Sequence, residues 1–128
     1  MLLDTSFLID FERELAGGRS RGAMRFLSEH AGVTPSISLF TWMEFVEGYP
    51  PEKEDACRIF LSDFPLILPD LAIAWRASRI FRTLRGTGSS IGDHDVWIAA
   101  SALERSMPLV TRNPRHLTRV PHLSILSY

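Results

Sequence analysis

Residues 1–15, MLLDTSFLIDFEREL, set the pattern for the whole chain. The apolar stretch Met1–Leu3 has the length of a short buried strand. It is followed by Asp4 and then by Thr5, a good helix-capping residue. Apolar side chains then recur at helical spacing, at Phe7, Leu8, Phe11 and Leu15. We therefore expect a strand that runs directly into a helix.

The same alternation continues outward along the chain. Further short strands are expected at 33–37, 66–68, 109–111 and 124–126. Helices are expected at 23–30, from 38 or 41 to 47, at 52–62, at 70–86, and from 93 or 95 to 103. Strands that alternate with helices form a mainly parallel sheet covered on both faces. The fold class predicted is α/β, a three-layer α/β/α sandwich forming a single domain over residues 1–128.

Composition excludes several classes of protein. The chain has 128 residues, of which 45% are hydrophobic and 23% charged, as in a globular protein that needs no metal or disulfide to hold its core. The single cysteine, Cys57, excludes an internal disulfide and a multi-cysteine zinc site. No apolar run approaches the length of a membrane span, and Asp4, Asp10 and Glu12 interrupt any signal peptide. We expect a cytoplasmic protein that makes no contact with a membrane.

The net charge of -1 predicts no bulk attraction to nucleic acid. All of the 14 basic residues except Lys53 are arginine, which suits contacts with phosphate, although a GC-rich genome explains this bias equally well. Four of the arginines recur every third residue on one expected helix and wrap around half of it, so most of them should face solvent: Arg76, Arg79, Arg82 and Arg85. Arg82 and Arg85, beside a glycine-rich loop, and Arg112 and Arg115, after the strand at 109–111, are the candidates for contacts with phosphate groups.

Polar residues gather where the expected strands end. Asp4 ends the first strand, and Asn113 follows the strand at 109–111. Glu44 lies in the helix after the second strand, and Asp93 and Asp95 open the helix before the strand at 109–111. In an open α/β sheet, ligands bind at the carboxyl ends of the strands. Carboxylates brought together there repel one another unless a cation neutralises them, which favours Mg²⁺ or Mn²⁺ and phosphodiester hydrolysis.

Each acidic residue also has a structural interpretation. Asp4 could simply cap the first helix, and Asp93 and Asp95 could be first-turn residues favoured by the helix dipole. Glu44 and Glu47 could belong to a solvated helix face, although the apolar neighbours of Glu44 make this less favoured. Spacing alone leaves these alternatives open.

Four motifs in order resemble PIN-domain ribonucleases, specifically the VapC-type toxins of toxin-antitoxin pairs. They are Leu2-Leu3-Asp4-Thr5-Ser6, Ser38-Leu39-Phe40-Thr41-Trp42-Met43-Glu44 with Gly48 after it, Asp95-Val96-Trp97-Ile98-Ala99-Ala100, and Leu109-Val110-Thr111-Arg112-Asn113. The resemblance covers nearly the whole chain. It departs from the family at the last motif, where Asn113 and His116 replace an additional aspartate, and at Ser6, where asparagine is frequent.

The resemblance implies the roles of the site residues. Asp4 and Asp95 would bind the metal, Mg²⁺ or Mn²⁺, and Glu44 would be a further ligand or would orient the attacking water. Asn113 would be auxiliary, and Asp93 is not selected by the motif. Hydroxyl groups would fix the carboxylates from Thr5, Ser6 and Thr111.

The resemblance also implies an activity and partners. The protein would be an endoribonuclease that leaves 5′-phosphate and 3′-hydroxyl ends, acting as the toxin of a pair with a cognate antitoxin protein, as a homodimer. The alternative is a non-catalytic PIN-like scaffold that binds RNA or protein, because the additional aspartate is replaced.

Other motifs carry less weight. Gly88-Ser89-Ser90-Ile91-Gly92, with Asp95 and His116 after it, matches a hydrolase nucleophile elbow, but such an elbow must follow a strand and this segment follows a helix. A phosphorelay receiver domain needs a lysine after a late strand, and Lys53 comes too early. The histidines show no paired spacing and are expected at the surface: His30, His94, His116 and His122.

Overall fold

A computed structural model describes all residues of the chain, 1–128. The strands are β1 (Leu2–Leu3), β2 (Ser36–Ser38), β3 (Leu66–Ile67), β4 (Leu109–Val110) and β5 (Ile125–Leu126). The helices are α1 (Thr5–Leu15), α2 (Gly22–Glu29), α3 (Leu39–Glu47), α4 (Glu54–Ser62), α5 (Leu71–Gly86), α6 (Asp93–Glu104) and α7 (Pro114–Leu117), with a 3₁₀ turn, η1 (Pro51–Lys53), before α4.

The strands form one parallel sheet in the order β3-β2-β1-β4-β5. β1 is central: Leu2 pairs with Ser36 on one side and Leu109 on the other, and Leu3 pairs with Ile37 and Val110. The carboxyl ends of β1, β2 and β4 therefore lie at one edge of the sheet.

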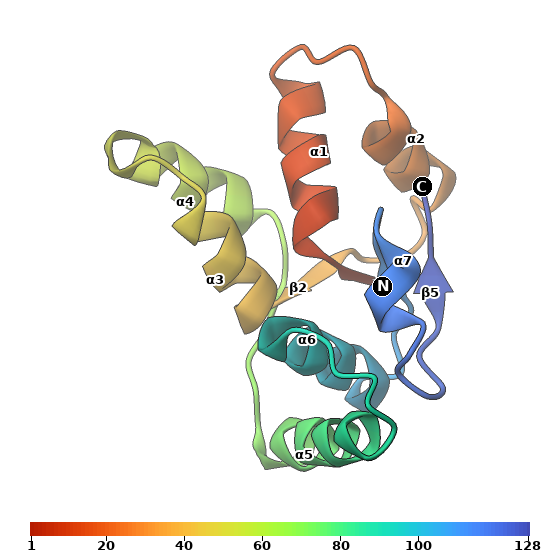
Figure 1. Cartoon of the computed structure of the whole chain (residues 1–128). Coiled ribbons are helices and arrows are strands. Elements are labelled where there is room, and N and C mark those ends of the chain that lie inside the picture. Colours follow the sequence, from red (N-terminus) through yellow and green to blue (C-terminus); the bar gives the residue numbers. More distant parts are fainter.

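Helices cover both faces of this sheet (Figure 1). Because successive strand residues point to opposite faces, Leu2 and Leu109 belong to a core with α5, α6 and α7, whereas Leu3 and Val110 belong to a second core with α1 to α4. All four of these strand residues are buried completely. The predicted three-layer α/β/α sandwich with a parallel central sheet is confirmed.

Side-chain caps explain where two of the helices begin. Ser38 Oγ accepts a hydrogen bond from the amide of Thr41 at the start of α3, and Asp70 accepts one from the amide of Ile73 at the start of α5. The helix from 38 or 41 thus begins immediately after its Ser38 cap.

The largest differences from the expectation concern one strand boundary and one helix. β2 spans Ser36–Ser38 rather than 33–37, because pairing with β1 starts opposite Leu2 and leaves Val33 exposed. The short helix α7, which begins with Pro114 in its first turn, was not predicted. The glycine-rich segment 88–92 follows α5 and not a strand, which excludes the nucleophile elbow. None of the helices combines the length and apolar character required to span a bilayer.

Candidate active site

Asp4 leaves β1 with its carboxylate directed to two hydroxyl groups. Its Oδ2 accepts hydrogen bonds from Ser6 Oγ at 2.9 Å and from Thr111 Oγ1 at 2.7 Å. Asp4 occupies the residue before α1, yet its side chain makes no hydrogen bond to the helix amides. The capping interpretation of Asp4 is therefore wrong. The expected hydroxyl contacts from Ser6 and Thr111 are present, and they fix the carboxylate across two neighbouring strands.

Glu44 is held from two sides. Thr5 Oγ1, at the start of α1, donates to Oε2, and Nδ1 of His94 lies 2.9 Å from Oε1. The side chain of Glu44 is only 28% exposed, whereas Glu47, one turn later on α3, is exposed. The interpretation of Glu44 as part of a solvated face is therefore wrong.

Asp95 lies in the first turn of α6, near enough to Asp4 and Glu44 for their charges to act on it. Burial raises the pKa of the Asp95 carboxyl, and the negative charges of Asp4 and Glu44 raise it further, against a smaller opposing effect of His116 and His94. The interpretation of Asp95 as only a first-turn residue favoured by the helix dipole does not account for its partial burial or for its repulsion by two other carboxylates. The structure brings Asp4, Glu44 and Asp95 to the same edge of the sheet.

Glu44 and Asp95 border an open pocket, and Asp4 lies outside its lining. Glu44, Asp93 and Asp95 line this pocket of about 410 Å³, together with Gly92 and His94. No set of three or more acidic, histidine or cysteine side chains lies close enough together to hold one metal ion between them. Hard oxygen donors in an open pocket fit Mg²⁺ or Mn²⁺, since Mg²⁺ usually takes one or two protein carboxylates and keeps several waters.

Asn113 and His116 follow β4 near this edge. The backbone amide of Asn113 donates to Thr111 Oγ1 at 3.0 Å, but its exposed side chain makes no cap for α7 and no hydrogen bond to the carboxylates. His116 is also exposed, and its charge lowers the pKa of Asp95. The backbone of Asn113 therefore lies next to the site, and His116 lies close enough to Asp95 for its charge to affect that carboxyl.

Two of the four histidines expected at the surface are only partly exposed. His94 contacts Glu44, and His30 stacks on the ring of Phe26 at 4.1 Å and is half-buried. Helical spacing gave no signal for His94, whose partner lies 50 residues earlier in the chain. Its position one residue before Asp95, at the start of a helix, was the only indication in the sequence.

Some of the arginines expected to contact solvent or phosphate form ion pairs within the protein. Nη1 of Arg112 lies 2.7 Å from each carboxylate oxygen of Asp10, which also accepts from the hydroxyl of Tyr128 at 2.9 Å. This carboxylate ties the last residue of the chain to α1, a contact with no sequence signal. On α5, Arg76 pairs with Glu104, whereas Arg79, Arg82 and Arg85 are exposed as expected.

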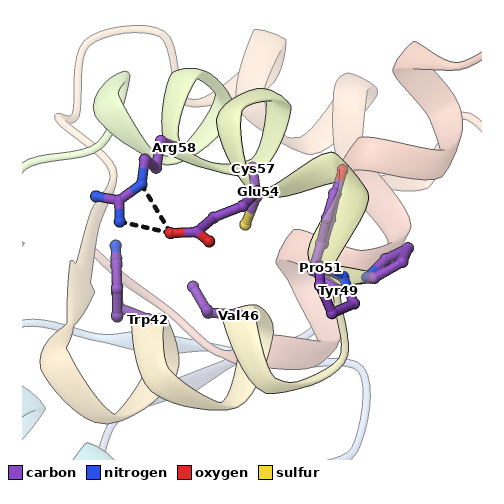
Figure 2. Close-up of a pocket in the computed structure, with 8 residues that line it drawn as sticks. Trp42, Val46, Tyr49, Pro51, Glu54, Cys57 and Arg58 are labelled. Atoms are coloured by element: carbon purple, nitrogen blue, oxygen red, sulfur yellow. Dashed lines mark hydrogen bonds and ion pairs between the residues drawn. The ribbon is translucent and has the colours of Figure 1, made fainter.

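A second cavity, of about 210 Å³, lies between α3 and the η1–α4 segment (Figure 2). Trp42, Val46 and Tyr49 line it from the α3 side, and Glu54 and Arg58 form an ion pair at its edge. Cys57 is the one thiol in its lining, and it is buried; burial raises the pKa of this thiol, and the charges of Glu12 and Glu54 add to the rise. A thiol kept protonated is a poor nucleophile.

Known proteins resemble this chain over nearly its whole length. The profile of the PIN domain matches residues 1–123. Ribonuclease VapC1 of Methanocaldococcus jannaschii is 33% identical, over 100% of this chain and 86% of the relative. A toxin-antitoxin complex from Klebsiella pneumoniae contains a chain that is 31% identical, with a TM-score of 0.76 over 98% of this chain and 94% of that one. VapBC2 from Rickettsia felis, bound to a DNA fragment from its promoter, has a TM-score of 0.84 at 23% identity, covering 99% of this chain and 97% of that one.

Proposed function

This chain belongs to the PIN-domain family, among its VapC ribonucleases, and on that premise we propose that it is a divalent-metal-dependent endoribonuclease acting as the toxin of a toxin-antitoxin pair. The observation that carries the proposal is the convergence of Asp4, Glu44 and Asp95 from three segments of the chain. These carboxylates repel one another, and a bound cation would relieve that repulsion.

Each residue at this edge has a proposed role. Asp4 and Asp95 are the proposed ligands of Mg²⁺ or Mn²⁺, and Glu44 is a further ligand or orients the attacking water. The bound ion would polarise the scissile phosphate and activate that water. Ser6 and Thr111 hold the Asp4 carboxylate through their hydroxyls. Asn113 would have an auxiliary role at the same edge.

The proposed partners are RNA and a cognate antitoxin protein. The antitoxin is supported by the Klebsiella pneumoniae complex, because its similar chain is described within a toxin-antitoxin assembly. The homodimer and the cytoplasmic location stay predictions of the sequence.

A cleavage assay on a single-stranded RNA tests the function. The parent protein should cut in Mn²⁺ or Mg²⁺, stop when a chelator is added, and leave 5′-phosphate and 3′-hydroxyl ends. Glu44→Gln should reduce the rate by roughly 10–100-fold, as expected for a residue that orients or completes a metal site. Glu47→Gln, on the same helix but exposed, is the matched control and should cut like the parent.

Absence of cleavage by the parent with either ion would favour the scaffold alternative. A rate for Glu44→Gln equal to that of the parent would instead refute the role of Glu44 while leaving the nuclease intact.

Thermal unfolding gives an independent test of the metal site. Mn²⁺ should raise the Tm of the parent, since an ion that binds only the folded state adds about 2.7 kcal/mol at a free concentration about a hundred times its Kd. Differential scanning fluorimetry with Mn²⁺, and with Ca²⁺ and K⁺ for comparison, measures the shift. An unchanged Tm across a Mn²⁺ titration to several millimolar would contradict a metal site at this edge.

A further inference from the structure

His94 lines the acidic pocket without belonging to any of the motifs that the sequence analysis identified. It lies in the first turn of α6, and its Nδ1 is 2.9 Å from Oε1 of Glu44 in α3. Its side chain is 42% exposed, so one part of the ring meets solvent while Nδ1 meets the carboxylate. The contact joins two helices that come from distant parts of the chain.

The direction of this hydrogen bond is determined by chemistry. An ionised carboxylate only accepts hydrogen bonds, so Nδ1 must carry the hydrogen. The other oxygen of Glu44 accepts from Thr5. Each oxygen therefore has its own donor, one from α6 and one from α1, and the carboxylate cannot rotate without losing one of them.

The imidazole ring is itself oriented by α3. Phe40, one helical turn before Glu44, lies 6.1 Å from the ring of His94, and Phe40 stacks on Trp97 of α6 at 4.9 Å. Residues four apart on a helix are neighbours on one face, so α3 presents an aromatic ring and a carboxylate to the same histidine. The ring of His94 thus has an aromatic neighbour and a hydrogen-bonded carboxylate on the same face of α3.

We propose that His94 is a positioning residue, whose Nδ1–H holds the Glu44 carboxylate in the orientation required for RNA cleavage. The inference rests on the proposed nuclease function and on the role of Glu44 in it. His94 acts through Glu44 and not through its own contact with RNA. Loss of a partner that orients a metal-site residue typically costs 10–100-fold in activity or metal affinity.

Two substitutions of His94 distinguish the effect of its hydrogen bond from the effect of its ring. His94→Phe keeps a ring against Phe40 but removes the donor, and we expect kcat to fall by roughly 10–100-fold with KM for RNA nearly unchanged. His94→Asn places an amide N–H close to the position of Nδ1, and it should restore most of the activity. The Tm of both variants should stay close to that of the parent.

A double-substitution cycle tests whether His94 works through Glu44. In a Glu44→Gln background, His94→Phe should cause little further loss, because the residue that it orients is already impaired. Side-chain ¹H–¹⁵N spectra of the metal-free parent should show a protonated Nδ1 on His94, and this signature should disappear in Glu44→Ala. This NMR measurement reports on His94 whether or not the protein cleaves RNA.

The outcomes distinguish the two proposals. If His94→Phe cleaves like the parent while Glu44→Gln is impaired, positioning by His94 is refuted and the nuclease stands. Equal losses on His94→Phe in the parent and in Glu44→Gln would also refute it, since they show an independent role. If the parent itself does not cleave RNA, the nuclease proposal fails and this inference fails with it.

Discussion

Asp95→Asn is expected to remove RNA cleavage, with a loss of at least ~10³-fold in kcat/KM, because metal polarisation of a phosphoryl group supplies several kcal/mol of transition-state stabilisation. Asparagine keeps the size of the side chain and loses its charge. Asp4→Asn should have a similar effect, since Asp4 is the other proposed metal ligand. Single-turnover cleavage of a labelled RNA in Mn²⁺ measures both variants.

The same Asp95→Asn substitution should raise the Tm of the metal-free protein at neutral pH. Burial and the charges of Asp4 and Glu44 raise the pKa of Asp95 above its ordinary value, so the folded state holds the proton more tightly than the unfolded state. A raised pKa contributes stability below the ordinary pKa of aspartate, and this contribution is lost as the pH rises through the folded pKa. At neutral pH the parent therefore carries an unfavourable charge that asparagine lacks, and the gain in Tm should vanish at acidic pH.

Asp55→Asn, at an exposed position in the first turn of α4, is the matched control for both readouts. It should cleave at the parent rate and show no pH-dependent gain in stability. A variant Asp95→Asn that cleaves normally would contradict the metal assignment. A fall in its Tm at neutral pH would contradict the repulsion between carboxylates.

Glu14→Ala is expected to destabilise the fold by about 2–4 kcal/mol, or roughly 10 °C in Tm. Glu14 lies in the last turn of α1 and is 2% exposed. Its carboxylate accepts hydrogen bonds from the amide of Ala23 at 3.2 Å and from that of Met24 at 2.9 Å, at the start of α2. These amides have no partner within the helix, so alanine would leave them buried without acceptors.

The effect of Glu14→Ala should depend on pH. Burial raises the pKa of Glu14, but the hydrogen bonds from the amides of Met24 and Ala23, together with those from Ser20 and Gly22, lower it to below the ordinary value. A lowered pKa contributes stability above the ordinary pKa of glutamate, and this stability is lost as the pH falls through the folded pKa. The difference between parent and variant in the free energy of unfolding should therefore shrink in acid.

Urea denaturation at neutral and acidic pH measures this difference. Glu29→Ala is the control, because the pair of Glu29 with Arg25 is exposed and separated by 3.7 Å, and such pairs contribute less than about 1 kcal/mol. Equal stability of Glu14→Ala and the parent at neutral pH would show that the connection between α1 and α2 does not depend on this carboxylate.

Local signals predicted most of the fold. Capping residues at Ser38 and Asp70, glycines at helix ends and the period of the apolar residues located nearly every helix and strand. The boundary of β2 was less well predicted, because pairing with β1 and not the composition of residues 33–38 determines where this strand begins. The short helix α7 was missed because four residues do not establish a period.

The site was predicted in part. Position at the ends of elements made Asp4 and Asp95 candidates, and the resemblance to PIN-domain ribonucleases selected them, with Ser6 and Thr111 as hydroxyl partners. The sequence could not exclude a capping role for Asp4 or a solvated face for Glu44. Both alternatives were removed by contacts with Thr111 and His94, which lie 107 and 50 residues away from their partners.

The sequence by itself determined the alternation of strands and helices, the α/β class and the acidic residues at the strand ends, because these depend on interactions between residues close together in the chain. Only the tertiary structure decided that Asp4 and Glu44 lie close enough to Asp95 for their charges to act on it, that His94 contacts Glu44, and that Glu14 caps α2. The physical reason is that hydrogen bonds and charge repulsion act over a few ångströms in space. The strand order that brings these side chains within that range leaves no periodic pattern in the sequence.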